Sequence, residues 1–105
     1  MINNRVKIRL PGEKLDDVLI NEYVTTATDR IKLRLGTSEL PAEFESIVVD
    51  VAVKMHRRNY YEGISSEGAD TFSTSFVEDL LNEYTAEFER YKEQQKEKDR
   101  LVRFL

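Results

Sequence analysis

The stretch from Ile47 to Met55 most constrains how this chain can fold. Apolar side chains fill it except at Asp50 and Lys54. These two charged residues are four positions apart, which places them on one side of a helix, and the alternation typical of a half-buried strand is missing. The many β-branched residues also permit a strand, but the spacing favours a helix. Because most of its circumference is apolar, we expect this helix, over residues 41–62, to be the most buried one.

Two further segments carry an apolar stripe. Between residues 14 and 35 apolar side chains recur every three or four positions, which predicts a helix, and Gly36 supplies a C-terminal stop. A third helix is predicted over residues 77–100, with acidic residues in its first turn. Its apolar face ends at Tyr91, and the remainder is polar on all sides.

These patterns predict an all-α protein with a single domain over residues 1–105. Three main helices form a small bundle, and residues 1–12 form a basic arm or a short helix that ends at Pro11–Gly12. Residues 63–76, rich in Ser, Gly and Thr, are expected to form a long loop or a small β-hairpin between the last two helices. Residues 101–105 form an apolar C-terminal tail.

Composition restricts the class of protein. The chain has 105 residues, of which 40% are hydrophobic and 34% charged, values typical of one soluble helix-rich domain. It has no cysteine, which excludes disulfides and thiolate metal sites. The longest apolar run is too short to cross a membrane, and residues 1–7 lack the features of a secretory signal. We therefore expect no membrane association and a protein that stays where it is made.

The charge of the chain is unevenly distributed. The net charge is −4; residues 1–61 hold 10 basic and 9 acidic residues, whereas residues 62–105 hold 6 and 11. An acidic protein is poorly suited to broad electrostatic binding of nucleic-acid phosphates. DNA binding is therefore not expected as the main task.

Candidate catalytic groups are few. His56, the only histidine, lies beside arginines near a helix end and is expected to pack or cap rather than act as a base. Asp16–Asp17 and Glu78–Asp79 lie at predicted helix starts, where acidic residues are favoured for electrostatic reasons. Gly63 and Gly68 do not belong to a phosphate-binding loop, because no Gly-Lys-Ser/Thr sequence follows. We expect no enzyme activity, no cofactor, no metal site and no small-molecule substrate.

Lys54, Arg57 and Arg58 lie on one side of the central helix, at positions i, i+3 and i+4. They are a possible basic contact patch for DNA in a channel or for acidic groups of a partner. Alternatively, they are solvated cations placed favourably near the negative end of the helix.

The apolar tail also has two explanations. Leu101, Val102, Phe104 and Leu105 either fold back onto the core or form an anchor at the end of a polar helical spacer. Such a spacer reaches about 13 Å if it is helical, and an apolar segment carried that far suits docking on a partner. Within the loop, Phe76 is expected to enter the core of its own subunit.

Several of these features, taken in order, resemble the head-tail connector, or head-completion, proteins of tailed bacteriophages. The resemblance extends from about Asp16 through Tyr91. It includes a helix start at Leu40–Pro41, a helix end from Asn59 to Gly63, and the Ser/Gly-rich loop from Glu62 to Phe76. The basic residues 1–10 depart from the acidic entry into the first helix that the family leads us to expect.

The resemblance implies a structural protein of the virion. In that family a small helical subunit docks on the portal and forms a ring of identical subunits, expected to be twelve-fold on the portal, between the DNA-filled head and the tail or a stopper protein. The ring extends the DNA channel, so DNA is only passing cargo, and the protein acts by binding. The implied location is the head-tail interface of the virion, and the host cytoplasm during assembly.

The resemblance also implies two sets of contact residues. The first set, expected to contact neighbouring subunits or adjoining connector proteins, is Ile64, Ser65, Ser66, Glu67, Gly68, Thr71, Phe72, Ser73 and Thr74. The second set, expected to dock on the portal, is Leu101, Val102, Phe104 and Leu105.

Two other functions fit parts of the sequence. A small adaptor or regulatory protein could dimerise through a coiled coil of its last helix, although the heptads after Tyr91 are poor. A DNA-binding regulator could use Lys54, Arg57 and Arg58 on a recognition helix, although that helix is strongly apolar. The first predicts a stable dimer, and the second predicts salt-dependent binding to duplex DNA.

Overall fold

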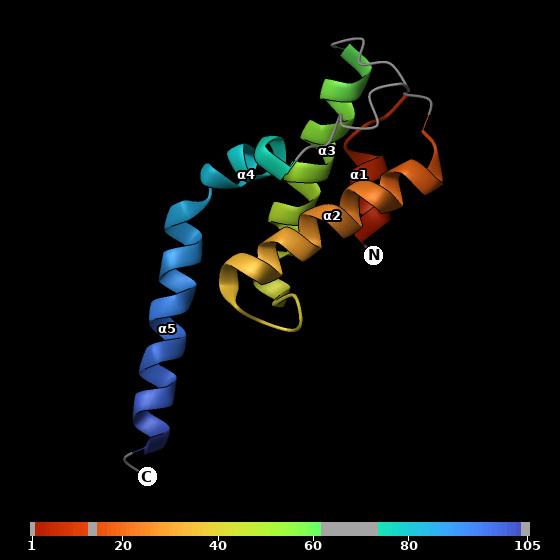
Figure 1. The fold of residues 1–105 in the computed structure, drawn as a ribbon. Coiled ribbons are helices and arrows are strands. Elements are labelled where there is room, and N and C mark those ends of the chain that lie inside the picture. The colour runs from red at the N-terminus through yellow and green to blue at the C-terminus, as the bar shows by residue number, and fades with distance from the viewer. Residues whose placement is uncertain (1, 13–14, 62–73, 104–105) are drawn as a thin grey trace.

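The computed structural model describes residues 2–12, 15–61 and 74–103 (Figure 1). These residues are mostly helical and contain no strand, so the all-α prediction is confirmed for them. The elements are α1 (Ile2–Ile8), α2 (Asp17–Leu35), a short 3₁₀ helix η1 (Ala42–Phe44), α3 (Glu45–Tyr61), α4 (Thr74–Asn82) and α5 (Thr85–Arg103). The predicted loop or hairpin falls largely on residues 62–73, which lie outside the described part of the chain.

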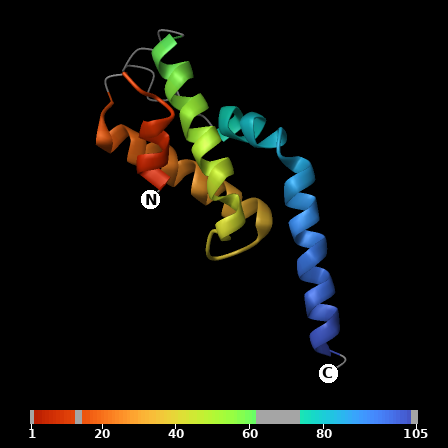
Figure 2. The same ribbon diagram turned by 180° about the vertical axis from the view of Figure 1, so that it is seen from behind.

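Helix α3 is the centre of the molecule. Its apolar residues between Ile47 and Met55 are buried on nearly every side, as the sequence indicates. Helix α2 crosses it on one side, and α1 packs against both (Figures 1 and 2). The two charged residues of this stretch, Asp50 and Lys54, lie at the edge of the core. Asp50 pairs with Arg9, in the turn after α1, and Lys54 pairs with Glu83, in the turn between α4 and α5. Burial of an apolar helix between two others is the main source of stability here.

Local sequence signals fix both ends of α2. The Asp16 carboxylate accepts hydrogen bonds from the backbone N–H groups of Val18 and Leu19, so the helix begins at Asp17. At the other end Gly36 has a φ of 70°, a left-handed conformation that glycine adopts without a steric cost. The Thr37 N–H then donates to the Lys32 carbonyl and closes the helix.

Helix α1 is part of the core. Val6 and Leu10 are buried, and Lys7 forms an ion pair of 2.5 Å with Asp17 at the start of α2. The N-terminal residues, for which the sequence predicts a basic arm or a short helix, therefore form a helix that lies against α2 and α3. The signal for this packing is the i, i+4 spacing of the two buried apolar residues.

The chain after residue 73 differs from the single helix predicted over residues 77–100. Helix α4 begins at Thr74, and a turn at Glu83–Tyr84 separates it from α5. Within this turn the Tyr84 N–H donates to the Leu81 carbonyl at 2.9 Å, and the Thr85 hydroxyl donates to the Asn82 carbonyl at 2.9 Å. The prediction of one continuous helix is wrong because good helix formers on both sides of the turn conceal it.

Packing explains why the chain turns here. Val77 and Leu81 of α4 are buried in the core formed with α2 and α3, whereas Phe88 of α5 is buried against Phe44 of η1. The turn lets the two helices follow different directions (Figures 1 and 2). The molecule is consequently elongated, 55 × 26 × 20 Å, with α5 projecting from the body formed by α1, α2 and α3. None of the helices in the described residues is both long enough and apolar enough to span a membrane.

Candidate interaction surfaces

Helix α5 is anchored to the body only near its start. The Phe88 ring stacks on Phe44 with ring centroids 5.5 Å apart, and the Tyr91 ring meets Phe44 edge-on at 5.3 Å. Past Lys92 the described side chains are exposed or half-buried, and Leu101 is 66% exposed. The end of α5 therefore presents a long surface that its own subunit does not cover.

Arg34 of α2 lies at the junction of α4 and α5. Its Nε and one terminal nitrogen donate to the Glu78 carboxylate, at 2.8 and 2.5 Å, and the same terminal nitrogen also reaches the Asn82 side-chain oxygen at 2.8 Å. The guanidinium carbon lies 5.6 Å from the centre of the Phe88 ring, a cation–π distance. One arginine thus contacts both helices that meet at the turn.

A second polar cluster holds the other side of this junction. Lys54 of α3 forms an ion pair of 2.5 Å with Glu83 and lies 5.4 Å from the centre of the Tyr84 ring. The hydrogen bond to Glu83 raises the pKa of the Lys54 ammonium above its ordinary value. Burial raises the pKa of the Tyr84 hydroxyl. Near neutral pH the lysine is therefore charged and the tyrosine neutral, the states in which these contacts form.

Two of the three residues in the predicted basic patch contact other groups of the same subunit. Lys54 is held by Glu83, and the Arg58 guanidinium lies 4.1 Å from the centre of the Phe76 ring of α4. Arg57 is exposed. Phe76, the predicted core residue of the loop, is half-buried and packs against the core. Sequence spacing alone could not show that α4 lies beside this face of α3.

Of the residues that the resemblance implies for contacts, the structure describes only a few. Thr74 is the first residue of α4, while the others of the first set, from Ile64 to Ser73, lie outside the described residues. In the second set Leu101 and Val102 belong to α5, and Phe104 and Leu105 lie outside the described residues. Among the described residues, Thr74 therefore lies at the start of α4, and Leu101 and Val102 lie near the end of α5.

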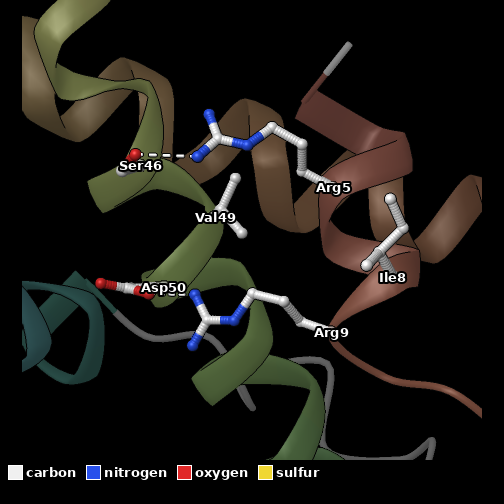
Figure 3. A pocket seen from close by; sticks show the side chains of 6 residues that line it. All are labelled: Arg5, Ile8, Arg9, Ser46, Val49 and Asp50. Atoms are coloured by element: carbon white, nitrogen blue, oxygen red, sulfur yellow. Dashed lines mark hydrogen bonds and ion pairs between the residues drawn. The ribbon is translucent and has the colours of Figure 1, made fainter.

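A surface that the sequence did not single out lies between α1 and α3. There, Arg5 of α1 and Arg9, in the turn after α1, reach across a hollow to Ser46 and Asp50 of α3 (Figure 3). Ile8 lies at the rim and is 74% exposed. The signal that could have found this surface is the i, i+4 spacing of Arg5 and Arg9.

The candidate chemical groups have structural roles. His56 is buried, and its ring packs edge-on against Tyr23 with centroids 6.2 Å apart. Asp16 caps α2, Asp17 pairs with Lys7, and Glu78 pairs with Arg34. Within the described part of the chain, no three metal-ligating side chains gather into a cluster that could hold an ion.

Comparison with known proteins agrees with a role in binding. No curated protein and no solved structure shows significant similarity to the chain. A family model described as phage gp6-like head-tail connector protein matches residues 4–92, which include most of α1, all of α2 to α4 and the anchored start of α5. Because this match covers most of the sequence, the chain belongs to the phage gp6-like head-tail connector family.

Proposed function

We propose that this protein binds the phage portal and forms a ring that connects the DNA-filled head to the tail or to a stopper protein. The observation that carries the proposal is the family match over residues 4–92. The ring extends the DNA channel, and the subunit acts by binding, without turnover. Identical subunits contact each other head to tail, and closure follows the rotational symmetry of the portal, twelve-fold in the ring we propose.

The exposed end of α5 supports a docking role. A helix of 19 residues is about 28 Å long, and only its start packs on the body, through Phe88 and Tyr91. Leu101 is carried to the far end of this helix and remains exposed. We propose that Leu101 and Val102, together with Phe104 and Leu105, dock on the portal.

Residues Ile64 to Thr74 remain the proposed contact with neighbouring subunits or with the downstream connector protein. Thr74 opens α4, so this segment leads directly into the helix that Arg34 and Arg58 hold against the body. Contacts made there are thereby linked to the body that carries α5. DNA passes through the ring as cargo and is not bound by sequence.

Native mass spectrometry of the chain alone, and then in excess over the portal ring of the same phage, tests this function. We expect a subunit that loads the portal to a saturating number of copies matching the portal symmetry. A stable dimer that ignores the portal would contradict the proposal and favour an adaptor that dimerises. Salt-dependent binding to duplex DNA would favour a regulator.

The docking segment is tested by three variants in the same measurement. A chain ending at Lys92 and the substitution Leu101→Ser should both lower portal loading at least tenfold. Gln94→Ser, at an exposed position on the same helix, serves as the matched control and should load like the original chain. If Leu101→Ser loads fully while the shortened chain does not, the apolar anchor lies elsewhere in the removed segment.

A further inference from the structure

Two large aliphatic side chains stand exposed beside hollows in the body. Ile8 of α1 is 74% exposed and borders a hollow of about 460 Å³. Leu33 of α2 is 70% exposed and borders a hollow of about 320 Å³. Single exposed aliphatic residues are common on protein surfaces. Here each one lies next to a space that could receive a side chain of similar size, and charged groups surround both spaces.

The first hollow lies between α1 and α3 and has an apolar floor (Figure 3). Val49 forms this floor. On one side Arg5 donates a hydrogen bond of 2.8 Å to the Ser46 hydroxyl, and on the other Arg9 forms an ion pair with Asp50. With two guanidinium groups and one carboxylate, this hollow carries a net positive charge.

The second hollow lies at the end of α2. It is lined by Leu33, by Asp29 and Lys32, and by the turn residues Thr37 and Ser38. Asp29 is one helical turn before Leu33, and its side chain is 60% exposed, with the Lys32 ammonium 3.7 Å away. A surface carboxylate beside an exposed leucine is the counterpart of the first hollow, where arginines flank an exposed isoleucine.

The two hollows lie on different sides of the body. Helix α2 passes in front of α1 and α3 in Figure 1, and α1 and α3 are nearer the viewer in the reverse view of Figure 2. In Figure 3, α2 lies behind the first hollow. At 100° per residue, Asp29 and Leu33 lie on the side of α2 opposite its buried residues Ala27 and Ile31. Leu33 therefore points away from the layer that carries Ile8.

We propose that these two hollows are the two halves of one contact between neighbouring copies of this chain. Leu33 of one copy enters the hollow beside Ile8 of the next, and that Ile8 enters the hollow beside Leu33. Asp29 then approaches Arg5, and Lys32 approaches Asp50. This inference rests on the proposed ring, because a head-to-tail contact joins two different patches of identical subunits. In a ring of many copies the two patches must lie on nearly opposite sides of each subunit, as these hollows do.

Introduced cysteines test the contact, since the chain has none of its own. The double variant Ile8→Cys/Leu33→Cys is treated with a short bismaleimide, with the portal and, at high concentration, without it. A head-to-tail contact should give a ladder of covalent oligomers. Mixing the two single variants should give dimers only, since each copy then carries one reactive site.

The matched control is Ile8→Cys/Val18→Cys. Val18 is 80% exposed on the same outer side of α2, but it lies about 22 Å along the helix from Leu33, so this pair should give no ladder. A double variant Ile8→Cys/Leu33→Cys that gives no more oligomers than this control overturns the proposed contact. Portal loading without a ladder would overturn the proposed contact and leave the connector function supported. A ladder without portal loading would support the contact and contradict the connector function.

Charge-reversal variants provide a second test. This test depends on the attraction between Arg5 and Asp29, whereas crosslinking depends only on the distance between the introduced cysteines. Arg5→Glu and Asp29→Arg should each reduce ring formation at least tenfold, and the chain carrying both should recover most of it. Glu39→Arg, an exposed position in the segment after α2, should have no effect. Circular dichroism of each variant confirms that the fold is kept. Failure of the double variant to recover, with all variants folded, excludes the pairing of Arg5 with Asp29 and instead indicates that the α1 hollow serves the portal or another partner.

Discussion

The body formed by α1, α2 and α3 and the helix α5 are both helical, but different forces stabilise them. In the body, all three helices contribute apolar residues to a core in which these side chains are almost completely buried. In α5, Phe88 is 2% exposed, whereas the described side chains past Lys92 are mostly exposed. The body is helical because its helices bury each other. The distal part of α5 consists mainly of residues with high helix propensity and can be helical without packing.

This difference suggests that the two regions have different functions. A surface that the subunit itself does not use is available for a partner, and α5 presents most of its length in this way. The body instead offers two local hollows on fixed helices. We therefore expect substitutions of buried residues in the body to alter folding, and substitutions at the two hollows or in the distal part of α5 to alter binding.

The largest expected effect is in the body. Ile31→Ala removes a fully buried side chain at the contact between α2 and the core, and should lower the free energy of unfolding by about 4 kcal/mol. Urea unfolding followed by circular dichroism measures this change. Leu33→Ala, two residues later and 70% exposed, is the control and should change the free energy by less than about 0.5 kcal/mol. Equal effects at the two positions would contradict the burial that distinguishes them.

The anchor of α5 should give the next largest effect. Phe88→Ala removes the ring that stacks on Phe44 and should cost about 3 kcal/mol. It should also release α5 from the body, so the radius of gyration measured by small-angle X-ray scattering should increase. Glu89→Ala, at an exposed position on the same turn, should change neither value. A large loss of stability with an unchanged radius would show that other contacts hold α5.

Arg34 should affect the direction of α5 more than the stability of the fold. Arg34→Met keeps the apolar stem beside Phe88 but loses the hydrogen bonds to Glu78 and Asn82, at a cost of about 2 kcal/mol. Spin labels on cysteines introduced at the exposed positions Thr25 and Glu97 should report a broader distance distribution.

Arg34→Lys serves as the comparison for that experiment. It keeps the charge but cannot reproduce the forked contact of a guanidinium group, so its distribution should lie between those of the original chain and Arg34→Met. A distribution for Arg34→Met as narrow as that of the original chain would show that Arg34 does not set the direction of α5.

The smallest expected effect is a dependence on alkaline pH. The pKa values of Lys54 and Tyr84 are raised above their ordinary values of 10.5 and 10.0, so both groups hold their protons more tightly in the folded state. Their contribution is present below these ordinary values and is lost as pH rises through the raised ones. Because the ion pair with Glu83 is exposed, the change should stay below about 1 kcal/mol.

The measurement is the free energy of unfolding between about pH 9 and pH 11.5. Tyr84→Phe removes one titrating group and should make the decline with rising pH less steep. Glu89→Gln, at an exposed position that leaves Lys54 and Tyr84 unchanged, is the control and should keep the original slope. An unchanged slope in Tyr84→Phe would show that this hydroxyl is not linked to folding.

Much of the body could be predicted because its signals are local. The spacing in the apolar stretch of α3 favoured a helix over a strand, and Gly36 predicted the end of α2. The family could also be recognised from the order of such features, although no single one of them is specific. The turn at Glu83–Tyr84 could not be predicted in this way, because the residues around it favour a helix and the cause of the turn is the packing of Val77 and Phe88 on different parts of the core.

The candidate surfaces also include features that the sequence predicts and features that depend on the fold. The polar end of α5 follows from the sequence, since a segment without an apolar face cannot join a core. The sequence left open whether Leu101 folds back onto the core, and its exposure is a finding of the structure. The contacts that Lys54 and Arg58 of the predicted basic patch make within the subunit depend on α4 and on the turn after it, which supply Phe76 and Glu83. The hollow between Arg5 and Arg9 depends on α1 lying against α3.

The sequence by itself therefore determined the helical class, the buried centre at α3 and the family of this protein. Its apolar spacing and capping residues act over one or two helical turns, so they can be read without a fold. Only the tertiary structure decided where α4 ends, how α5 leaves the body and which charged groups remain open to a partner. These depend on contacts between residues that are far apart in the chain, such as Arg34 with Glu78 and Arg9 with Asp50, whose pairing local propensity cannot specify.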